Sequence, residues 1–277
     1  MKKNAFKYSS FFLILIISIS MFFPFEVKKN SEKALSFKEK ISSLPQNSSL
    51  LVSIAVDYPS SYEMTPLIEA LVGQALRENI SVVFVSLHPS SADMIDTIIS
   101  GARKYFEKKE RKLIYGEHYT DLGYVPGGIF AVAAMSENIK NFIPEDVEGT
   151  KLTAIPAMKN INNLNDFDCI ADFFSEMSSG TYSSVLYSSF TVKNGQNPII
   201  VSGSSAYYTT EIKPFVNREQ IDAVISGPHE AETYIKLVDE KQSEKYSRYS
   251  FSYSVIYLAF IAVIIFANIF RITGEQP

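Results

Sequence analysis

The sequence predicts an α/β fold, a doubly wound and mostly parallel sheet of the Rossmann-like class, flanked by N- and C-terminal transmembrane helices. Two observations lead to this prediction. Compact apolar runs alternate with segments of helical periodicity between residues 49 and 245, which is typical of a parallel sheet covered by helices. Two uncharged apolar stretches lie outside this region, one toward each end of the chain. We therefore expect one domain of ordinary size between two membrane segments.

The predicted strands are short apolar runs that end at turn residues. Such runs suit strands whose two faces are both covered. They span residues 49–56, 80–87, 169–174 and 198–202, and a shorter run at 112–115 opens a further strand. Helical periodicity covers residues 66–77, 91–106 and 129–142, and a last helix is predicted to start at Pro228. Residues 181–189 suit a helix or a loop, and residues 144–165 a long irregular loop.

The two apolar stretches differ in length and flanks. Residues 251–270 carry no charge and are long enough to cross a bilayer of about 30 Å as a helix. Residues 8–25 follow a lysine-rich tail and fit either a signal peptide or a membrane anchor. We favour an uncleaved anchor, because no A-x-A-like cleavage site follows Phe25. Residues 27–40 then read as a short, charged helical stalk.

Charge predicts the orientation of these segments. Lys2, Lys3 and Lys7 form a short tail without an acid, which favours the cytoplasmic side. Two spans place both termini there and the domain outside a bacterial cytoplasmic membrane. The predicted parts are a cytoplasmic tail (1–7), a transmembrane helix (8–25), a stalk (26–48), the α/β domain (49–245), a second transmembrane helix (251–270) and a second cytoplasmic tail (271–277).

The composition of the chain excludes several classes of partner and cofactor. The chain of 277 residues has a net charge of −4 and no basic stripe, so no nucleic-acid partner is expected. Its single cysteine, Cys169, excludes an internal disulfide and a cysteine-rich zinc site. His88, His118 and His229 lack metal-ligand spacing, and no metal is expected. The loop after the first strand, DYPSSYEMTP, has no glycine for a pyrophosphate, so no nucleotide cofactor is expected.

Polar residues follow the ends of the predicted strands, where open parallel sheets bind ligands. The candidate ligand-binding residues of this crevice are Asp57, Tyr58, Ser86, His88, Ser202 and Ser204. Ser90, Ser175, Ser179 and Ser205 occupy similar positions. The alternative is that such residues turn the chain and cap helices. A Ser/His/Asp triad can be assembled from Ser86 or Ser202 with His88 and Asp57, but no G-x-S-x-G elbow is present.

Two further motifs supply candidate interaction residues. The stretch YGEHYTDLGYVPGG contains Tyr119, Tyr124, Gly127 and Gly128, and its glycine pair precedes a predicted helix. These glycines suit either an anion-binding turn or a tight entry into a packed helix. The stretch GPHEAETY contains His229 and Glu230. Glu230 near a helix start also complements the helix dipole.

Four motifs together resemble an uncharacterised family of two-span bacterial membrane proteins. They are VDYPSSYEMTP, YGEHYTDLGYVPGG, ISGPHEAETY and QSEKYSRYSF, and the resemblance runs from about Lys40 to the C-terminus. It implies one α/β domain between two spans and supplies no activity, substrate or catalytic residue. The chain departs from the family where PHEAET replaces a GxxGAAEYE-like run, which puts a close packing contact in doubt.

The function expected from the sequence is that of a non-enzymatic, membrane-anchored scaffold or assembly subunit. It would dock a partner membrane protein or form a homo-oligomer. Tethering at both ends and the lack of a catalytic signature favour this hypothesis. Ser252, Ser254 and Asn268, in or near the second span, suit contacts with a neighbouring helix. The alternatives are a ligand-binding or sensing domain that uses the strand-end crevice and, third, a hydrolase.

Overall fold

The domain is built on a six-stranded sheet in which every pairing is parallel and the order is β3-β2-β1-β4-β5-β6. In chain order the strands are β1 (Ser49–Ala55), β2 (Ser81–Ser86), β3 (Tyr119–Tyr124), β4 (Cys169–Phe174), β5 (Ile199–Ser204) and β6 (Ala223–Ser226). The order reverses between β1 and β4, as in a doubly wound Rossmann-like fold. The predicted fold class is confirmed for this domain.

The computed structural model describes residues 32–106, 112–175, 183–191 and 197–240, together with 246–247, 255–256 and 260. The chain divides into two compact units, and the unit that contains the sheet runs from Asn30 to Asp239. The other unit combines Met1–Lys29 with Glu240–Pro277. The predicted spans at 8–25 and 251–270 lie outside the described residues, apart from 255, 256 and 260, and so do both predicted tails. In the described parts of the chain, no helix combines the length and apolar character needed to cross a membrane.

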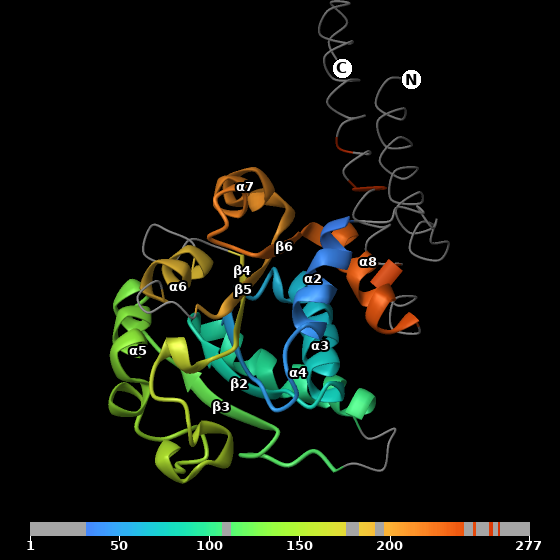
Figure 1. Cartoon of the computed structure of the whole chain (residues 1–277). Helices are drawn as coiled ribbons and strands as arrows, with labels where there is room; N and C mark the ends of the chain where they lie inside the picture. The colour runs from blue at the N-terminus through green and yellow to red at the C-terminus, as the bar shows by residue number, and fades with distance from the viewer. Residues whose placement is uncertain are drawn as a thin grey trace, which may run out of the picture. The chain divides into compact units, whose positions relative to one another are not determined.

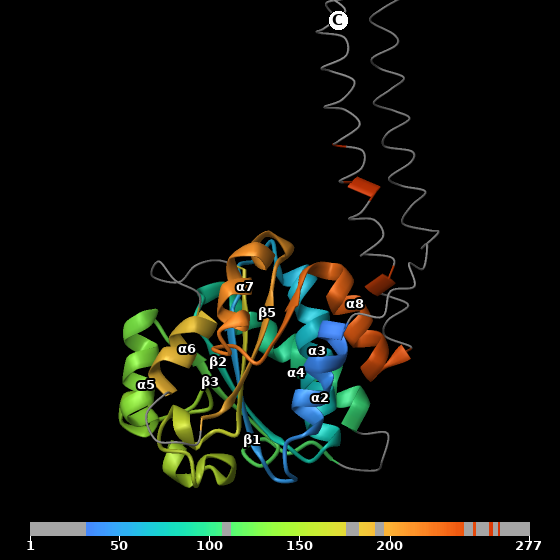
Figure 2. The same cartoon turned by 45° about the horizontal axis from the view of Figure 1, so that its top comes forward.

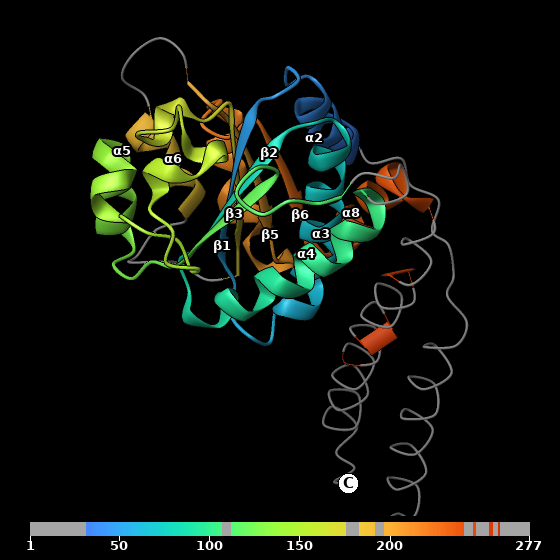
Figure 3. The same cartoon turned by 90° about the horizontal axis from the view of Figure 1, so that it is seen from below.

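Helices cover both faces of the sheet (Figures 1 and 2). One face carries α2 (Glu32–Ser42), α3 (Ser61–Arg77), α4 (Ala92–Phe106) and α8 (Gly227–Val238). The other carries α5 (Ile129–Phe142), α6 (Ser183–Thr191) and α7 (Thr209–Asn217). Figure 3, seen from below, shows α3, α4 and α8 on one side of the strands and α5 and α6 on the other.

The extent to which each strand is buried explains whether it could be predicted from the sequence. All residues of β1 and β4 are buried, so these strands are continuous apolar runs and were predicted within one residue. The third strand was predicted at 112–115, and this prediction is wrong. Tyr115 forms only an isolated bridge, and β3 begins at Tyr119. As an edge strand, β3 alternates buried and partly exposed residues and lacks an apolar run. The strand β6, which has four residues, and the helix α7 were not predicted from the sequence.

The helix α2 belongs to the same compact unit as the sheet. Its helical character was predicted, but its residues Ala34, Phe37 and Ile41 are fully buried. The Phe37 ring meets the Tyr234 ring of α8 edge to face, with centroids 5.1 Å apart. An ion pair of 3.1 Å joins Lys40 to Asp222 near the start of β6. The charged residues between Glu32 and Lys40 therefore form the outer side of a packed helix.

The glycine pair before α5 is required by the backbone. Gly127 and Gly128 have φ values of 120° and 53°, a backbone conformation that residues other than glycine rarely adopt. Gly128 is the N-cap of α5, so the pair turns the chain directly from the edge strand into this helix. This arrangement matches the alternative of a tight entry into a packed helix.

The long loop after α5 is irregular, as predicted, and it contains three short 3₁₀ helices. They are η3 (Leu152–Ala154), η4 (Pro156–Met158) and η5 (Leu164–Asp166). Leu152, Met158 and Leu164 are fully buried in the core cluster on the α5 side of the sheet. Two further 3₁₀ helices, η1 (Pro89–Ser91) and η6 (Ala206–Tyr208), follow β2 and β5 at the carboxyl edge of the sheet.

Candidate functional site

The loops that follow β1 and β4 meet where the strand order reverses, the place where doubly wound folds bind ligands. Here Ser175 Oγ donates to Asp57 Oδ1 at 2.6 Å and accepts the Asp57 backbone N–H at 2.8 Å. Asp57 Oδ1 also accepts the Ser60 N–H at 3.3 Å. Ser179, the other serine predicted after β4, lies outside the described residues. These contacts join the two loops to each other, so part of the hydrogen-bonding capacity of Asp57 is used within the domain.

The carboxyl of Asp57 is kept ionised by its neighbours. Partial burial alone would raise its pKa, but hydrogen bonds from Ser175 and Ser60 and the charge of His88 outweigh this effect. The net result is a pKa below the ordinary value of an aspartate. A half-buried negative charge therefore lies at the centre of the carboxyl edge of the sheet.

The residues of the predicted triad have other partners. Ser86 is fully buried, and its Oγ donates to the backbone carbonyl of His88 at 2.6 Å. The His88 Nδ1 atom accepts the Ser90 N–H at 3.2 Å and so caps η1. Ser202 is also fully buried and pairs with Ser184. Ser86 and His88 therefore turn the chain after β2, the role that the capping alternative assigned to them.

Ser202 belongs to a buried polar row inside the sheet. Ser53, Asp172 and Ser202 lie side by side on the three central strands and are fully buried. Asp172 Oδ2 accepts the hydroxyls of Ser183 at 2.6 Å and Ser184 at 2.7 Å, both in the first turn of α6. Because Ser184 has one hydroxyl hydrogen, Ser202 must be the donor in their 2.8 Å contact. Sequence reasoning missed Asp172, because it lies inside an apolar run.

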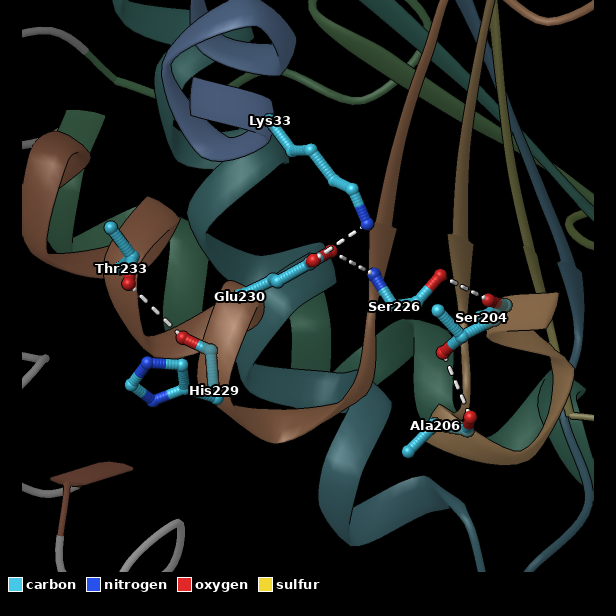
Figure 4. A network of polar contacts seen from close by, with 8 residues as sticks. Lys33, Ser204, Ala206, Ser226, His229, Glu230 and Thr233 are labelled. Carbon is cyan, nitrogen blue, oxygen red and sulfur yellow. Dashed lines mark hydrogen bonds and ion pairs between the residues drawn. The ribbon is translucent and has the colours of Figure 1, made fainter. Parts of the chain in front are cut away.

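Ser204, His229 and Glu230 lie near the end of β6 (Figure 4). Ser204 Oγ and Ser226 Oγ are 2.9 Å apart, and the Ser226 N–H donates to Glu230 Oε2 at 2.9 Å. Glu230 Oε1 also accepts from Lys33 of α2 at 2.7 Å. The His229 ring points away from Ser226 and Ser204 (Figure 4). Glu230 therefore holds the start of α8 against α2.

The YGEHYTDLGYVPGG motif forms the edge strand and its flanking turns. Tyr115 Oη donates to Asp146 Oδ2 at 2.8 Å, and burial followed by this contact raises the pKa of Tyr115. The Tyr119 ring meets the Tyr115 ring edge to face, with centroids 5.2 Å apart. Tyr119 thus lies at the start of β3 and within a packed pair. Tyr124 lies at the other end of β3 and is exposed.

Exposed aromatic side chains gather along the carboxyl edge. We call Tyr58, Tyr62, Tyr124, Phe130 and Tyr207 the aromatic edge. Each belongs to a strand end, the loop after it or the first turn of the next helix, following β1, β3 and β5. Their exposed fractions run from 43% for Tyr124 to 80% for Phe130. The Tyr58 and Tyr62 rings meet edge to face at 6.4 Å. Parallel strands bring these distant positions to the same side of the domain.

Of the aromatic edge, only Tyr58 and Tyr124 are among the residues predicted from the sequence. Tyr62, Phe130 and Tyr207 were missed, although each lies within a few residues of a strand end. Proximity to a strand end is the signal in the sequence that indicates them, whereas the predicted crevice rested on polar character. Glu63, beside Tyr62 in the first turn of α3, was missed for a different reason: its burial depends on η6.

Glu63 is a buried carboxyl at this edge. Burial raises its pKa to about 7, and a hydrogen bond from the Ala206 backbone N–H acts in the opposite direction. Asp121 of β3 is similar, because burial raises its pKa to about 6. Both groups therefore exchange protons near neutral pH, which links the stability of the domain to pH.

We expect Glu63→Gln to flatten the pH dependence of stability. The unfolded chain loses the Glu63 proton near 4.5 and the folded chain near 7, so the folded state binds more protons between these values. The free energy of unfolding should fall as pH rises through this window, by up to about 3 kcal/mol. Urea titrations below pH 4.5 and above pH 7 measure this change.

The Glu63→Gln protein should match the natural protein at the lower pH and be more stable at the higher one. Asp121→Asn is the comparison: it should reduce the slope over a lower window, between pH 3.8 and about 6. Parallel pH profiles for the natural and Glu63→Gln proteins would show that Glu63 is not a buried acid.

A separate hollow of about 420 Å³ lies at the opposite, amino-terminal edge of the sheet. Ser49, Ser81 and Asp168, at the starts of β1, β2 and β4, are among its lining residues. Asp168 Oδ2 accepts the Ser49 N–H at 2.8 Å and so braces the start of β1. This hollow is distant from every residue of the predicted crevice, because it lies at the other end of the strands.

No family model matches the chain, and no curated protein or solved structure is similar enough to serve as a relative. The structure defines an α/β domain with an all-parallel, Rossmann-like sheet. The resemblance to two-span proteins implied one α/β domain between two spans, and the structure shows the α/β domain. Within the described residues, no group of His, Cys, Asp and Glu side chains is arranged to hold a metal ion.

Proposed function

We propose that this protein is a non-enzymatic docking subunit whose α/β domain binds a polypeptide partner through the aromatic edge. The observation that carries this proposal is the gathering of five exposed aromatic side chains at one edge of the sheet. Tyrosine and phenylalanine are enriched in protein interfaces, because each ring supplies a large contact area with few rotatable bonds. Isolated exposed aromatics are common, but a row along one edge is typical of a binding surface.

The hydrogen bonds at the same edge favour a polypeptide over a small ligand. Asp57 and Ser175 join the loops that would have to part to form a nucleotide crevice. Ser86 and Ser202 are fully buried, with hydroxyls that contact other protein groups. Tyr58 and Tyr207, in the segments that follow β1 and β5, are largely exposed, which suits a broad contact with another chain.

The apolar stretches at 8–25 and 251–270 extend the proposal to a membrane. In it, the protein crosses a bacterial cytoplasmic membrane twice and holds the α/β domain on the extracytoplasmic side. The partner is then another membrane protein or a second copy of this chain. Two tethers would keep the domain at the membrane and raise its effective concentration near such a partner.

Site-specific photo-crosslinking in intact membranes tests the docking surface. A photoreactive phenylalanine analogue at Tyr58 or Tyr207 should yield a discrete product of higher mass that contains a second polypeptide. The matched control is Phe142, an aromatic residue that is 40% exposed at the far end of α5. It should yield no such product. Equal crosslinking at all three positions, or none at Tyr58 and Tyr207, would contradict the proposal.

A further inference from the structure

We infer that the partner presents basic side chains, lysine or arginine, to the aromatic edge. This inference rests on the proposed docking function and adds the chemistry of the partner to it. Two features of the described residues lead to it: the exposed acids that accompany the aromatic edge, and the position of an ionised carboxylate beside exposed rings.

Acidic side chains accompany the aromatic edge. Four of the helices that begin at this edge carry an acid in the first turn, namely Glu63 in α3, Asp93 in α4, Glu211 in α7 and Glu230 in α8, whereas α5 and α6 carry none. Asp57 precedes α3. Asp93 and Glu211 are exposed, whereas Glu230 is paired with Lys33. Helix dipoles favour such residues, but a dipole supplies only about half a unit charge. A full carboxylate charge therefore exceeds the dipole at the exposed residues Asp93 and Glu211.

Basic side chains lie at the opposite edge. The last turns of the helices on both faces carry Lys40, Arg77, Arg103, Lys104, Lys140 and Lys236. Since α3, α4, α5 and α8 all follow parallel strands, their last turns lie toward the amino-terminal edge of the sheet. Acids also lie at this edge, among them Glu78, Glu117, Asp168 and Asp222, so basic and acidic side chains are mixed there.

The centre of the aromatic edge suits a cation in particular. Asp57 lies next to Tyr58 in the chain, and Tyr58 and Tyr62 are 68% and 63% exposed. The pKa of Asp57 is lowered, so its carboxylate is charged at neutral pH. An arginine or lysine side chain can stack on an aromatic face and pair with a carboxylate at the same time. The adjacent residues Asp57 and Tyr58 therefore offer both kinds of contact to one such side chain.

The same charges argue against a lipid surface as the occupant. Anionic lipids attract basic protein segments. An edge with Asp57, Asp93 and Glu211 would be repelled by such a surface. Tyrosines also occur at membrane interfaces, but there they accompany lysine and arginine. A basic polypeptide is the occupant that satisfies both the rings and the charges.

Fluorescence anisotropy with a labelled oligo-arginine peptide tests the inference on the full-length protein in detergent. The peptide should bind, and its affinity should fall as salt is added. The double substitution Asp57→Asn/Asp93→Asn should weaken binding about fivefold or more. The matched control, Glu39→Gln/Glu117→Gln, removes two exposed acids away from the aromatic edge and should change the affinity little. Tyr58→Ala, at an exposed position, provides a second test that does not depend on a charge.

The outcomes separate the inference from the proposed function. Equal weakening by the two double substitutions, with no effect of Tyr58→Ala, would overturn the inference and indicate non-specific attraction. Tighter binding to vesicles of anionic lipid than to the peptide would overturn it in favour of a membrane surface. If crosslinking at Tyr58 still captures a polypeptide, docking stands and only the basic partner is wrong. If crosslinking also fails, both proposals fall. Melting temperatures of all variants establish that each is folded.

Discussion

Gly203→Ala should lower the free energy of unfolding by about 2 to 3 kcal/mol, although it adds a single methyl group. Gly203 lies in β5, and a Cβ atom there would lie 2.6 Å from Phe173 Cε1 and 3.2 Å from Leu67 Cδ2. Phe173 and Leu67 are buried with almost no exposure, so neither can move aside without disturbing the packing between β4, β5 and α3. Urea unfolding of the natural and substituted proteins measures the difference.

Gly101→Ala is the matched control for this prediction. A Cβ atom at Gly101, in α4, would meet the Glu69 side chain, which is long and partly exposed and can rotate. Alanine is favoured over glycine inside a helix by about 1 kcal/mol. We therefore expect Gly101→Ala to be neutral or stabilising. If both substitutions destabilise equally, the loss reflects the change of residue type, and the packing around Phe173 is not the cause.

Asp172→Ala should lower the free energy of unfolding by about 3 kcal/mol or more. Its carboxyl accepts the hydroxyls of Ser183 and Ser184, and Ser202 donates to Ser184 in turn. Removing the carboxyl leaves two buried hydroxyl donors without their acceptor and leaves a cavity beneath the start of α6. The first turn of α6 also loses the group that complements its dipole.

Asp172→Asn separates the hydrogen bonds from the charge. Burial raises the pKa of Asp172, against the opposing effect of the serine hydroxyls, so a neutral amide of the same shape should be tolerated better than alanine. We expect the asparagine variant to lose less than half as much stability as the alanine variant. Hydrogen exchange of the α6 amides should be faster in Asp172→Ala and nearly unchanged in Asp172→Asn. Equal losses in the two variants would show that the carboxylate itself, and not the cavity, sets the cost.

The polar residues at the strand ends show how far a sequence pattern predicts a site. The pattern indicated that residues after β1, β2, β4 and β5 share one edge, and the parallel sheet confirms that placement. It did not distinguish surface residues from buried ones. Ser86 and Ser202 lie inside the fold, and Asp57 is bonded to Ser175, which is 118 residues away in the chain. Such a pairing depends on which loops come into contact in the folded domain. The pattern of residues along one strand carries no information on this.

The sequence by itself determined the central strands and most helices, because strands buried on both faces are continuous apolar runs and helices keep their own period. It also determined the turn into α5, since only glycine readily adopts the backbone conformation at Gly127 and Gly128. Tertiary structure decided the rest. The packing of α2 against α8, the row of Ser53, Asp172 and Ser202, and the aromatic edge all bring together residues far apart in the chain. These features depend on the order of the strands, which creates contacts that no local pattern records.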